Sequence, residues 1–216
     1  MMLYHFLMEL LFPPKCVLCR KLLKNGETDL CRECRSDAPE YPNRKIKLPF
    51  LDSFAAVWYY EGNVRSSLLR YKFYNARSYS VSYGRILAMK LLREYPEGFD
   101  ILTWVPVSRL RKLRRGYDQV ELLARAVGTE LGVTPVSTLK KIRNNRPQSH
   151  IKDPAARKAN VLGAYQLKPD ADVKGKRVLL LDDILTTGAT AGECGRVLLS
   201  AGAKEVHCAA VAAARK

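Results

Sequence analysis

The segment from Arg177 to Thr190 constrains the fold of this chain more than any other. It reads RVLLLDDILTTGAT, in which apolar residues lead into Asp182 and Asp183 and a turn of threonines and glycine precedes a helical pattern. In open α/β sheets, ligands bind at the carboxyl ends of the strands. A turn of small residues exposes backbone N–H groups, and the dipole of the following helix adds positive potential. The segment therefore predicts a phosphate site.

The two acidic residues indicate what else the ligand carries. Two carboxylates beside a phosphate site fit a ligand that brings hydroxyl groups or a metal ion in addition to its phosphate. A ribose 5-phosphate combines a phosphate with such hydroxyl groups. We expect its vicinal hydroxyls to donate to Asp182 and Asp183 and its phosphate to bind Leu185, Thr186, Thr187, Gly188, Ala189 and Thr190. The alternative is an ordinary strand end and helix cap, but a cap needs one Ser, Thr or Asp. The Walker A and Gly-x-Gly-x-x-Gly patterns are absent.

This segment resembles the phosphoribosyl-diphosphate (PRPP) loop of type I phosphoribosyltransferases. The resemblance covers the strand, Asp182-Asp183 and Thr186-Thr187-Gly188-x-Thr190. It implies an α/β domain with the type I phosphoribosyltransferase fold, in which Mg²⁺ accompanies PRPP. Asp182 and Asp183 are the residues we expect to hold the reacting ribose.

Four cysteines near the N-terminus form a second motif. Cys16-x-x-Cys19 is followed, after a polar loop, by Cys31-x-x-Cys34. Two such knuckles chelate one tetrahedral ion, and four thiolates suit Zn²⁺. A four-thiolate site has no open position, so the zinc is predicted to be structural. Two disulfides are the alternative, which a cytoplasmic location disfavours.

The net charge favours an anionic partner. The chain has 216 residues, 37 Lys and Arg against 21 Asp and Glu, and a formal charge of +16. Phosphates, nucleic acid or acidic lipid fit this charge, although a solvated basic surface explains it equally well. Residues 1–12 are apolar but too short for a transmembrane span and lack a basic leader, so we expect a cytoplasmic protein without a transmembrane segment.

Basic residues also follow two predicted elements. The stretch RYKFYNARS places Lys72 among aromatic residues, which can bind phosphates and stack bases; core packing is the alternative for its tyrosines. After a strand at 101–107 comes a dense basic loop, whose alternative is a solvated charged surface. The residues predicted to bind pyrophosphate or another anion are Lys72, Ser108, Arg109, Arg114 and Arg115.

Strand and helix patterns alternate along the chain, which predicts a mainly parallel sheet flanked by helices. Strands are expected at 54–60, 101–107, 136–142, 164–167, 178–182 and 205–212, and helices at 3–11, 64–73, 77–95, 117–131 and 189–200. A polar linker is expected at 39–49, and Cys194 and Cys208 are expected in the core. The domains would be 1–48, with an N-terminal helix and the four-cysteine zinc finger, and 49–216, with the phosphoribosyltransferase-like fold.

The order of the motifs resembles the ComF family of competence proteins. The shared features are the zinc knuckles, Val105-Pro106-Val107, Arg115-Gly116-Tyr117-Asp118-Gln119, Arg146-x-Gln148, Arg157-x-x-Asn160 and the Asp182–Gly188 loop. The family usually has Asn where this chain has Asp118, and an ion pair of Asp118 with Arg114 or Arg115 would weaken an anion site. The resemblance implies uptake of single-stranded DNA alongside a helicase-like partner protein.

Two functions follow. In the first, the chain handles single-stranded DNA and its loop binds PRPP or another ribose phosphate without obvious turnover. In the second, it is an active phosphoribosyltransferase that transfers the phosphoribosyl group from PRPP to a nitrogen acceptor such as a purine base. Enzyme activity is left open because the acceptor site cannot be identified from sequence.

Overall fold

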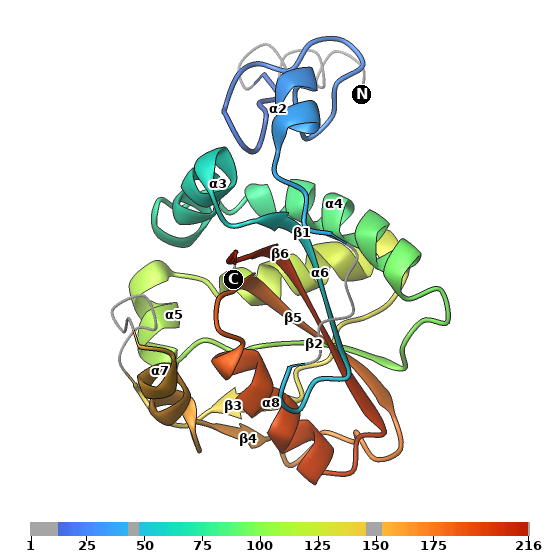
Figure 1. Ribbon diagram of the computed structural model, residues 1–216, viewed down its shortest axis with the longest axis vertical. Coiled ribbons are helices and arrows are strands. Elements are labelled where there is room, and N and C mark those ends of the chain that lie inside the picture. The colour runs from blue at the N-terminus through green and yellow to red at the C-terminus, as the bar shows by residue number, and fades with distance from the viewer. Residues whose placement is uncertain (1–12, 43–47, 146–152, 216) are drawn as a thin grey trace.

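Strand β5 (Arg177–Leu185) is an internal strand of the main sheet in the computed structural model, which describes residues 13–42, 48–145 and 153–215 (Figure 1). It pairs in parallel with β6 (Glu205–Ala213) on one side and with β2 (Ile101–Trp104) on the other. β1 (Ser53–Tyr59) pairs in parallel with β6, which gives the order β1-β6-β5-β2. The carboxyl ends of these strands therefore meet at one edge of the sheet.

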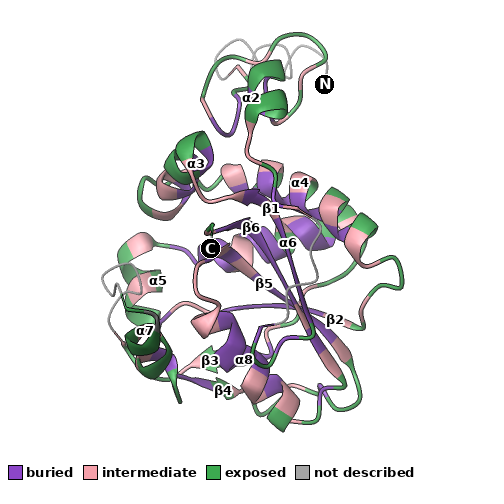
Figure 2. Ribbon diagram, viewed as in Figure 1, coloured by how far each residue is buried: buried purple, intermediate pink, exposed green. Residues whose placement is uncertain are grey.

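Helices cover both faces of this sheet. α4 (Tyr79–Glu94) and α6 (Gln119–Leu131) pack on one face, and α8 (Ala189–Ser200) packs on the other (Figure 1). Side chains alternate along a strand, so Leu179 and Leu181 join the apolar cluster with α6 while Val178 and Leu180 join the one with α8. Figure 2 shows the resulting buried strands. Burial on both faces explains the continuous apolar run of β5.

Two predicted strands lie outside this sheet. β3 (Leu139–Lys141) and β4 (Tyr165–Leu167) pair antiparallel in a small sheet of their own. α7 (Pro154–Val161) connects them and packs with α8, as β4 does. The main sheet is thus parallel throughout, and the antiparallel pair is a second sheet.

The predicted basic loop after β2 is a helix, and this part of the sequence interpretation was wrong. α5 (Arg109–Arg115) begins after Ser108, whose Oγ accepts from the backbone N–H of Arg111 at 3.4 Å, and ends at Gly116, which has a φ of 75°. Arg, Lys and Leu are good helix formers, so charge density alone did not indicate a loop. β2 itself ends at Trp104, before Pro106, which has no N–H to donate to a neighbouring strand.

The remaining helices and strands agree with expectation. Helices predicted at 64–73, 77–95, 117–131 and 189–200 correspond to α3 (Gly62–Phe73), α4, α6 and α8, and a short helix, α2 (Arg32–Asp37), follows Cys31. Cys194 and Cys208 are buried as predicted. The helix predicted at 3–11 lies outside the described residues.

Parts of the linker predicted at 39–49 pack into the protein, although its composition is polar. The backbone N–H of Tyr41 donates to the carbonyl of Val57, and the Tyr41 and Leu48 side chains are buried in the cluster around α8. Within the described parts of the chain, none of the helices has the length and apolar character needed to cross a membrane.

Candidate functional site

The predicted phosphate loop joins the end of β5 to the start of α8. Gly188 precedes α8 with a φ of 79°, a left-handed conformation that favours glycine. The hydroxyl of Thr187 accepts from the backbone N–H of Ala189 at 3.4 Å. Residues 186–190 are half-buried at the carboxyl edge of the sheet. The loop therefore presents hydroxyl and backbone N–H groups at the positive end of a twelve-residue helix.

Leu48 packs against this loop. A Cβ atom added at Gly188 would lie 3.0 Å from Leu48 Cδ1. The backbone that follows Leu48 passes close over α8. Added Cβ atoms at Gly192 and Gly195 would lie 2.9 Å and 2.3 Å from the carbonyl oxygens of Pro49 and Phe50, respectively. Glycines on this face of α8 thus let the backbone after the zinc module rest directly on the helix that carries the phosphate loop.

Asp183 is buried in a network of polar contacts on the α6 face of the sheet. Only 2% of the residue is exposed. Its Oδ1 lies 2.9 Å from Nζ of Lys72, and its Oδ2 accepts from Nε2 of Gln119 at 3.0 Å. A buried carboxylate requires such partners because desolvation of an unpaired charge is costly. Lys72, predicted to bind an anionic ligand, is therefore already engaged with Asp183.

Asp182 faces the opposite side of the strand, as alternation requires. Burial, together with the charge of Asp183, raises the pKa of its carboxyl group to about 8, while Lys72 opposes the shift. On the same side, burial and the charge of Arg111 lower the pKa of Lys141 to about 8, while Asp182 raises it. The environment thus favours the protonated form of Asp182, and a cationic ligand or a metal ion would favour its ionised form.

The residues predicted to bind pyrophosphate occupy three places. Ser108 is buried as the cap of α5, and Arg109 is exposed beside it. Arg114 and Arg115 lie at the other end of this helix, where the guanidinium carbon of Arg115 is 5.0 Å from the centre of the Phe73 ring. Lys72 lies at Asp183. Their role in binding pyrophosphate stays a prediction.

Asp118 does not form the ion pair that the sequence interpretation considered. It caps α6, and its Oδ1 accepts from the backbone N–H groups of Val120 and Glu121 at 2.9 and 3.1 Å. Its Oδ2 accepts from the backbone N–H of Val107 at 3.2 Å. Burial raises the pKa of Asp118, while these backbone donors lower it. Asp and Asn cap helices equally well, so this departure from the ComF pattern preserves the cap.

Gln119 is a site residue to which sequence reasoning gave no role. Its side chain donates to Asp183 and accepts from Nη1 of Arg115 at 2.8 Å. It therefore connects the basic end of α5 with the buried carboxylate. Its place in the Arg115–Gln119 motif was the only sequence signal. The Arg146-x-Gln148 motif lies outside the described residues, while Asn160 is in α7, where its carbonyl accepts from Asn145 at 2.7 Å.

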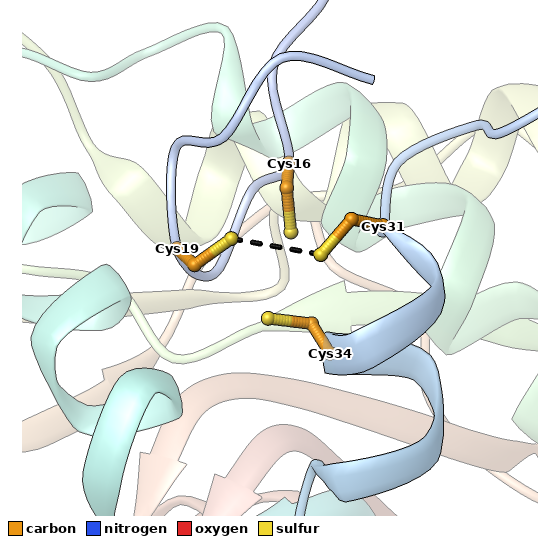
Figure 3. A group of neighbouring side chains, drawn as sticks. All are labelled: Cys16, Cys19, Cys31 and Cys34. Carbon is orange, nitrogen blue, oxygen red and sulfur yellow. Dashed lines mark hydrogen bonds between the residues drawn. The ribbon is translucent and has the colours of Figure 1, made fainter. Parts of the chain in front are cut away.

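The four cysteines converge as a metal site would require. Figure 3 shows the thiols of Cys16 and Cys19 from one loop meeting those of Cys31 and Cys34 from the start of α2. All four sulfur atoms lie within 4.8 Å of one another, and those of Cys19 and Cys31 are 3.6 Å apart. Tetrahedral Zn²⁺ with bonds of about 2.3 Å places sulfurs about 3.8 Å apart. A disulfide needs about 2.05 Å.

The four thiols differ in their environments, and burial raises the pKa of Cys19 and Cys34. Burial raises the pKa of the Cys16 thiol, but backbone N–H groups of Cys19, Cys31 and Leu18 outweigh this and lower it to about 7. Donors of this kind stabilise a thiolate, which is the form that binds zinc. The residues thus fit a structural zinc ion with four cysteine ligands.

The zinc module contacts the helices above the sheet. The Ser67 hydroxyl donates to the carbonyl of Val17, and the Arg70 guanidinium donates to that of Leu18, both within the first knuckle. Arg85 of α4 lies 3.5 Å from Asp29. Ser67 and Arg70 belong to α3, which also carries Lys72. One helix therefore contacts both the zinc module and the buried carboxylate of the main site.

Comparison with known proteins finds matches to both parts. Residues 113–216 match the phosphoribosyl transferase domain family, and residues 7–45 match the double zinc ribbon domain family. The fold is thus of the type I phosphoribosyltransferase kind, with a zinc ribbon at its N-terminus. This confirms the predicted fold class and the predicted structural zinc site.

Similar proteins also include relatives matched over most of their length. Competence protein F of Haemophilus influenzae is 24% identical, covering 89% of this chain and 94% of the relative. Competence protein ComFC of Streptococcus pneumoniae is 28% identical, covering 89% and 96%. DNA utilization protein YhgH of Escherichia coli is 25% identical, covering 90% and 95%.

Among solved structures, a glutamine PRPP amidotransferase from B. subtilis is similar at 23% identity with a TM-score of 0.43. The match covers 65% of this chain and 30% of that one.

Proposed function

We propose that this chain, a homologue of the ComF family of competence proteins, handles single-stranded DNA during natural transformation. We also propose that it binds PRPP or a related ribose phosphate at residues 182–190. The names of the relatives support the competence role. The observation that carries the ligand is the loop at the end of β5, where Gly188 turns the chain into α8 behind two acidic residues.

The loop would bind the 5-phosphate and leave the ribose at the end of β5. Backbone N–H groups at the start of α8 and the hydroxyls of Thr186, Thr187 and Thr190 are suitable donors to phosphate oxygens. Asp183 is held in place by Lys72 and Gln119, so its carboxylate is fixed before a ligand arrives. When Mg²⁺ accompanies the diphosphate it neutralises part of the charge, and carboxylates such as Asp182 and Asp183 are the oxygen donors that it prefers.

The DNA-handling role is supported by charge as well as by the relatives. The formal charge of +16 is large for 216 residues and favours a polyanion. We expect the protein to act in the cytoplasm beside a helicase-like partner, where incoming single strands would meet it. A DNA strand shares one chemical group with the loop ligand, a phosphate on the 5-carbon of a pentose, although it lacks the vicinal hydroxyls.

A calorimetric titration with PRPP and Mg²⁺ tests the ligand directly. We expect binding to the intact protein and at least tenfold weaker binding to Gly188→Val, because a β-branched residue resists a φ of 79° and would contact Leu48. Gly132→Val is the matched control, since Gly132 has a φ of 69° and nothing near an added Cβ. Absence of PRPP binding to the intact protein would refute the ligand.

A second candidate function is phosphoribosyl transfer. The complete Asp182–Gly188 loop favours it. A nitrogen of the acceptor would form the new bond to the ribose carbon as the bond from that carbon to pyrophosphate breaks, and the pyrophosphate leaves with both bonding electrons. Screening purine and pyrimidine bases for pyrophosphate release tests it, and the release should be lost in Asp183→Asn.

A further inference from the structure

We propose that the facing ends of α3 and α5 form a binding surface for single-stranded DNA, which we call the aromatic–arginine surface and define as Phe73, Tyr74, Arg77, Arg114 and Arg115. This assignment rests on the proposed DNA-handling function and gives it a location. The surface begins at the end of α3 that carries Lys72, the partner of Asp183 in the predicted ribose-phosphate site.

Two large aromatic residues are exposed where α3 ends. Phe73 is 58% exposed and Tyr74 is 76% exposed, while the preceding Tyr71 is fully buried. Tyr71 is thus a core residue, as the sequence interpretation allowed for the tyrosines. Phe73 and Tyr74 have no such packing role to explain them. Exposed rings of this kind provide stacking surfaces for unpaired bases, which are accessible only in single strands.

Three arginines belong to this part of the molecule. Arg115 lies over the Phe73 ring, and the guanidinium carbon of Arg77 lies 4.8 Å from the centre of the Tyr117 ring, which is itself buried. Arg114 is exposed and directly precedes Arg115 in α5. In the described part of the chain, none of these arginines has a carboxylate within 4.0 Å. Their charges are therefore not neutralised by the protein, which suits the phosphates of a nucleic acid backbone.

The backbone geometry supports a shaped surface. Arg77 reaches back across Gly116, where an added Cβ would lie 2.9 Å from its Nη2 atom. Its Nε donates to Oδ1 of Asn75 at 2.9 Å, and Asn75 has a φ of 55° in the turn between α3 and α4. Contacts with Asn75 and with the Gly116–Tyr117 segment thus fix the position of the Arg77 side chain, which reduces the entropy lost on binding.

A continuous set of contacts joins this surface to the ribose-phosphate site. Arg115 contacts Phe73 and donates to Gln119, and Gln119 donates to Asp183. Asp183 pairs with Lys72, which directly precedes Phe73 in the chain. A strand bound to the surface would therefore lie close to the carboxyl end of β5, where Asp183 is held.

Fluorescence anisotropy with a labelled oligothymidylate of roughly 12 nucleotides tests the surface. We expect Tyr74→Ala to weaken binding about tenfold and Tyr74→Phe to preserve it, because stacking needs the ring and not the hydroxyl. Phe50→Ala is the control, since Phe50 is also an exposed aromatic residue, at 47%, but lies against α8.

Salt dependence tests the arginines. Each phosphate contact to a single strand contributes about 0.7 to the negative slope of log affinity against log salt. Arg115→Met and Arg77→Met should each reduce that slope by about this amount, while Arg93→Met, an exposed arginine at the far end of α4, should leave it unchanged. Unchanged affinity and slope in both the aromatic and the arginine variants would overturn the surface.

The two proposals fail in different ways. If the intact protein does not bind the oligonucleotide at low salt, the DNA-handling function itself is refuted. If it binds but only variants of the zinc module, such as Arg20→Met or Lys24→Met, weaken binding, the function stands and the surface proposed here is wrong. Preference for double-stranded over single-stranded DNA of equal length would also overturn it, because stacked bases cannot reach the rings.

Discussion

Replacement of Lys72 by Met should destabilise the protein markedly. The Nζ atom of Lys72 lies 2.9 Å from Oδ1 of Asp183, and the two side chains are only 21% and 4% exposed. Removing one member of a buried ion pair leaves the other charge desolvated, which costs about 3–5 kcal/mol. Gln119 keeps one hydrogen bond to the carboxylate, so we expect a loss of about 3 kcal/mol, the lower end of this range. For a chain of this length, that corresponds to a fall in Tm of roughly 6–12 °C.

Urea unfolding followed by circular dichroism measures this loss. Lys204→Met is the matched control, since Lys204 pairs with Glu205 at 3.8 Å and the two side chains are 64% and 37% exposed. That exposed pair should contribute less than about 1 kcal/mol. The double variant Lys72→Met with Asp183→Asn should be more stable than the sum of the single losses predicts, because no unpaired charge is left. If Lys72→Met costs no more than Lys204→Met, the argument for a buried pair is wrong.

Three further predictions concern the zinc module, pH and helix packing. Elemental analysis should find one zinc ion per chain, and Cys34→Ser should lose it. Loss of the zinc should also increase hydrogen exchange in α3, which contacts the first knuckle, and unchanged exchange would argue against coupling between α3 and the zinc module. The pKa of Asp182 is raised to about 8 from an ordinary 3.8, so the folded state holds a proton that the unfolded state releases, and stability should fall as pH rises from about 4 to 8. Asp182→Asn should flatten this dependence, and an unchanged slope would refute the assignment. Gly84→Ala should destabilise the protein by about 1–3 kcal/mol in urea unfolding, because the new Cβ would lie 2.5 Å from Cβ of Ala126. Ser82→Ala on the same helix is the control, and a gain in stability in Gly84→Ala would contradict the close packing of α4 and α6.

Local chemistry was readable from the sequence. The cysteine spacing determined the knuckles, because two residues between the thiols form a turn that brings them together. The run from Arg177 to Thr190 determined strand, turn and helix in order, since its apolar residues, glycine and threonines each suit one of those structures. The Asp182–Thr190 site itself stays a prediction, although these elements place its residues together.

Only the tertiary structure decided how distant residues meet. Lys72 was predicted as a ligand contact and is the partner of Asp183, and Gln119 links that carboxylate to Arg115. Charge density at 109–115 indicated a loop, yet caps at Ser108 and Gly116 and good helix formers between them made α5. The pairing of Asp183 with Lys72 and Gln119 depends on how β5 lies against α3 and α6, which no local pattern encodes. The sequence by itself determined which chemical groups the chain carries and how each short segment folds. The packing of the sheet decided which of those groups are paired inside the protein and which, such as Arg77 and Tyr74, remain exposed for a partner.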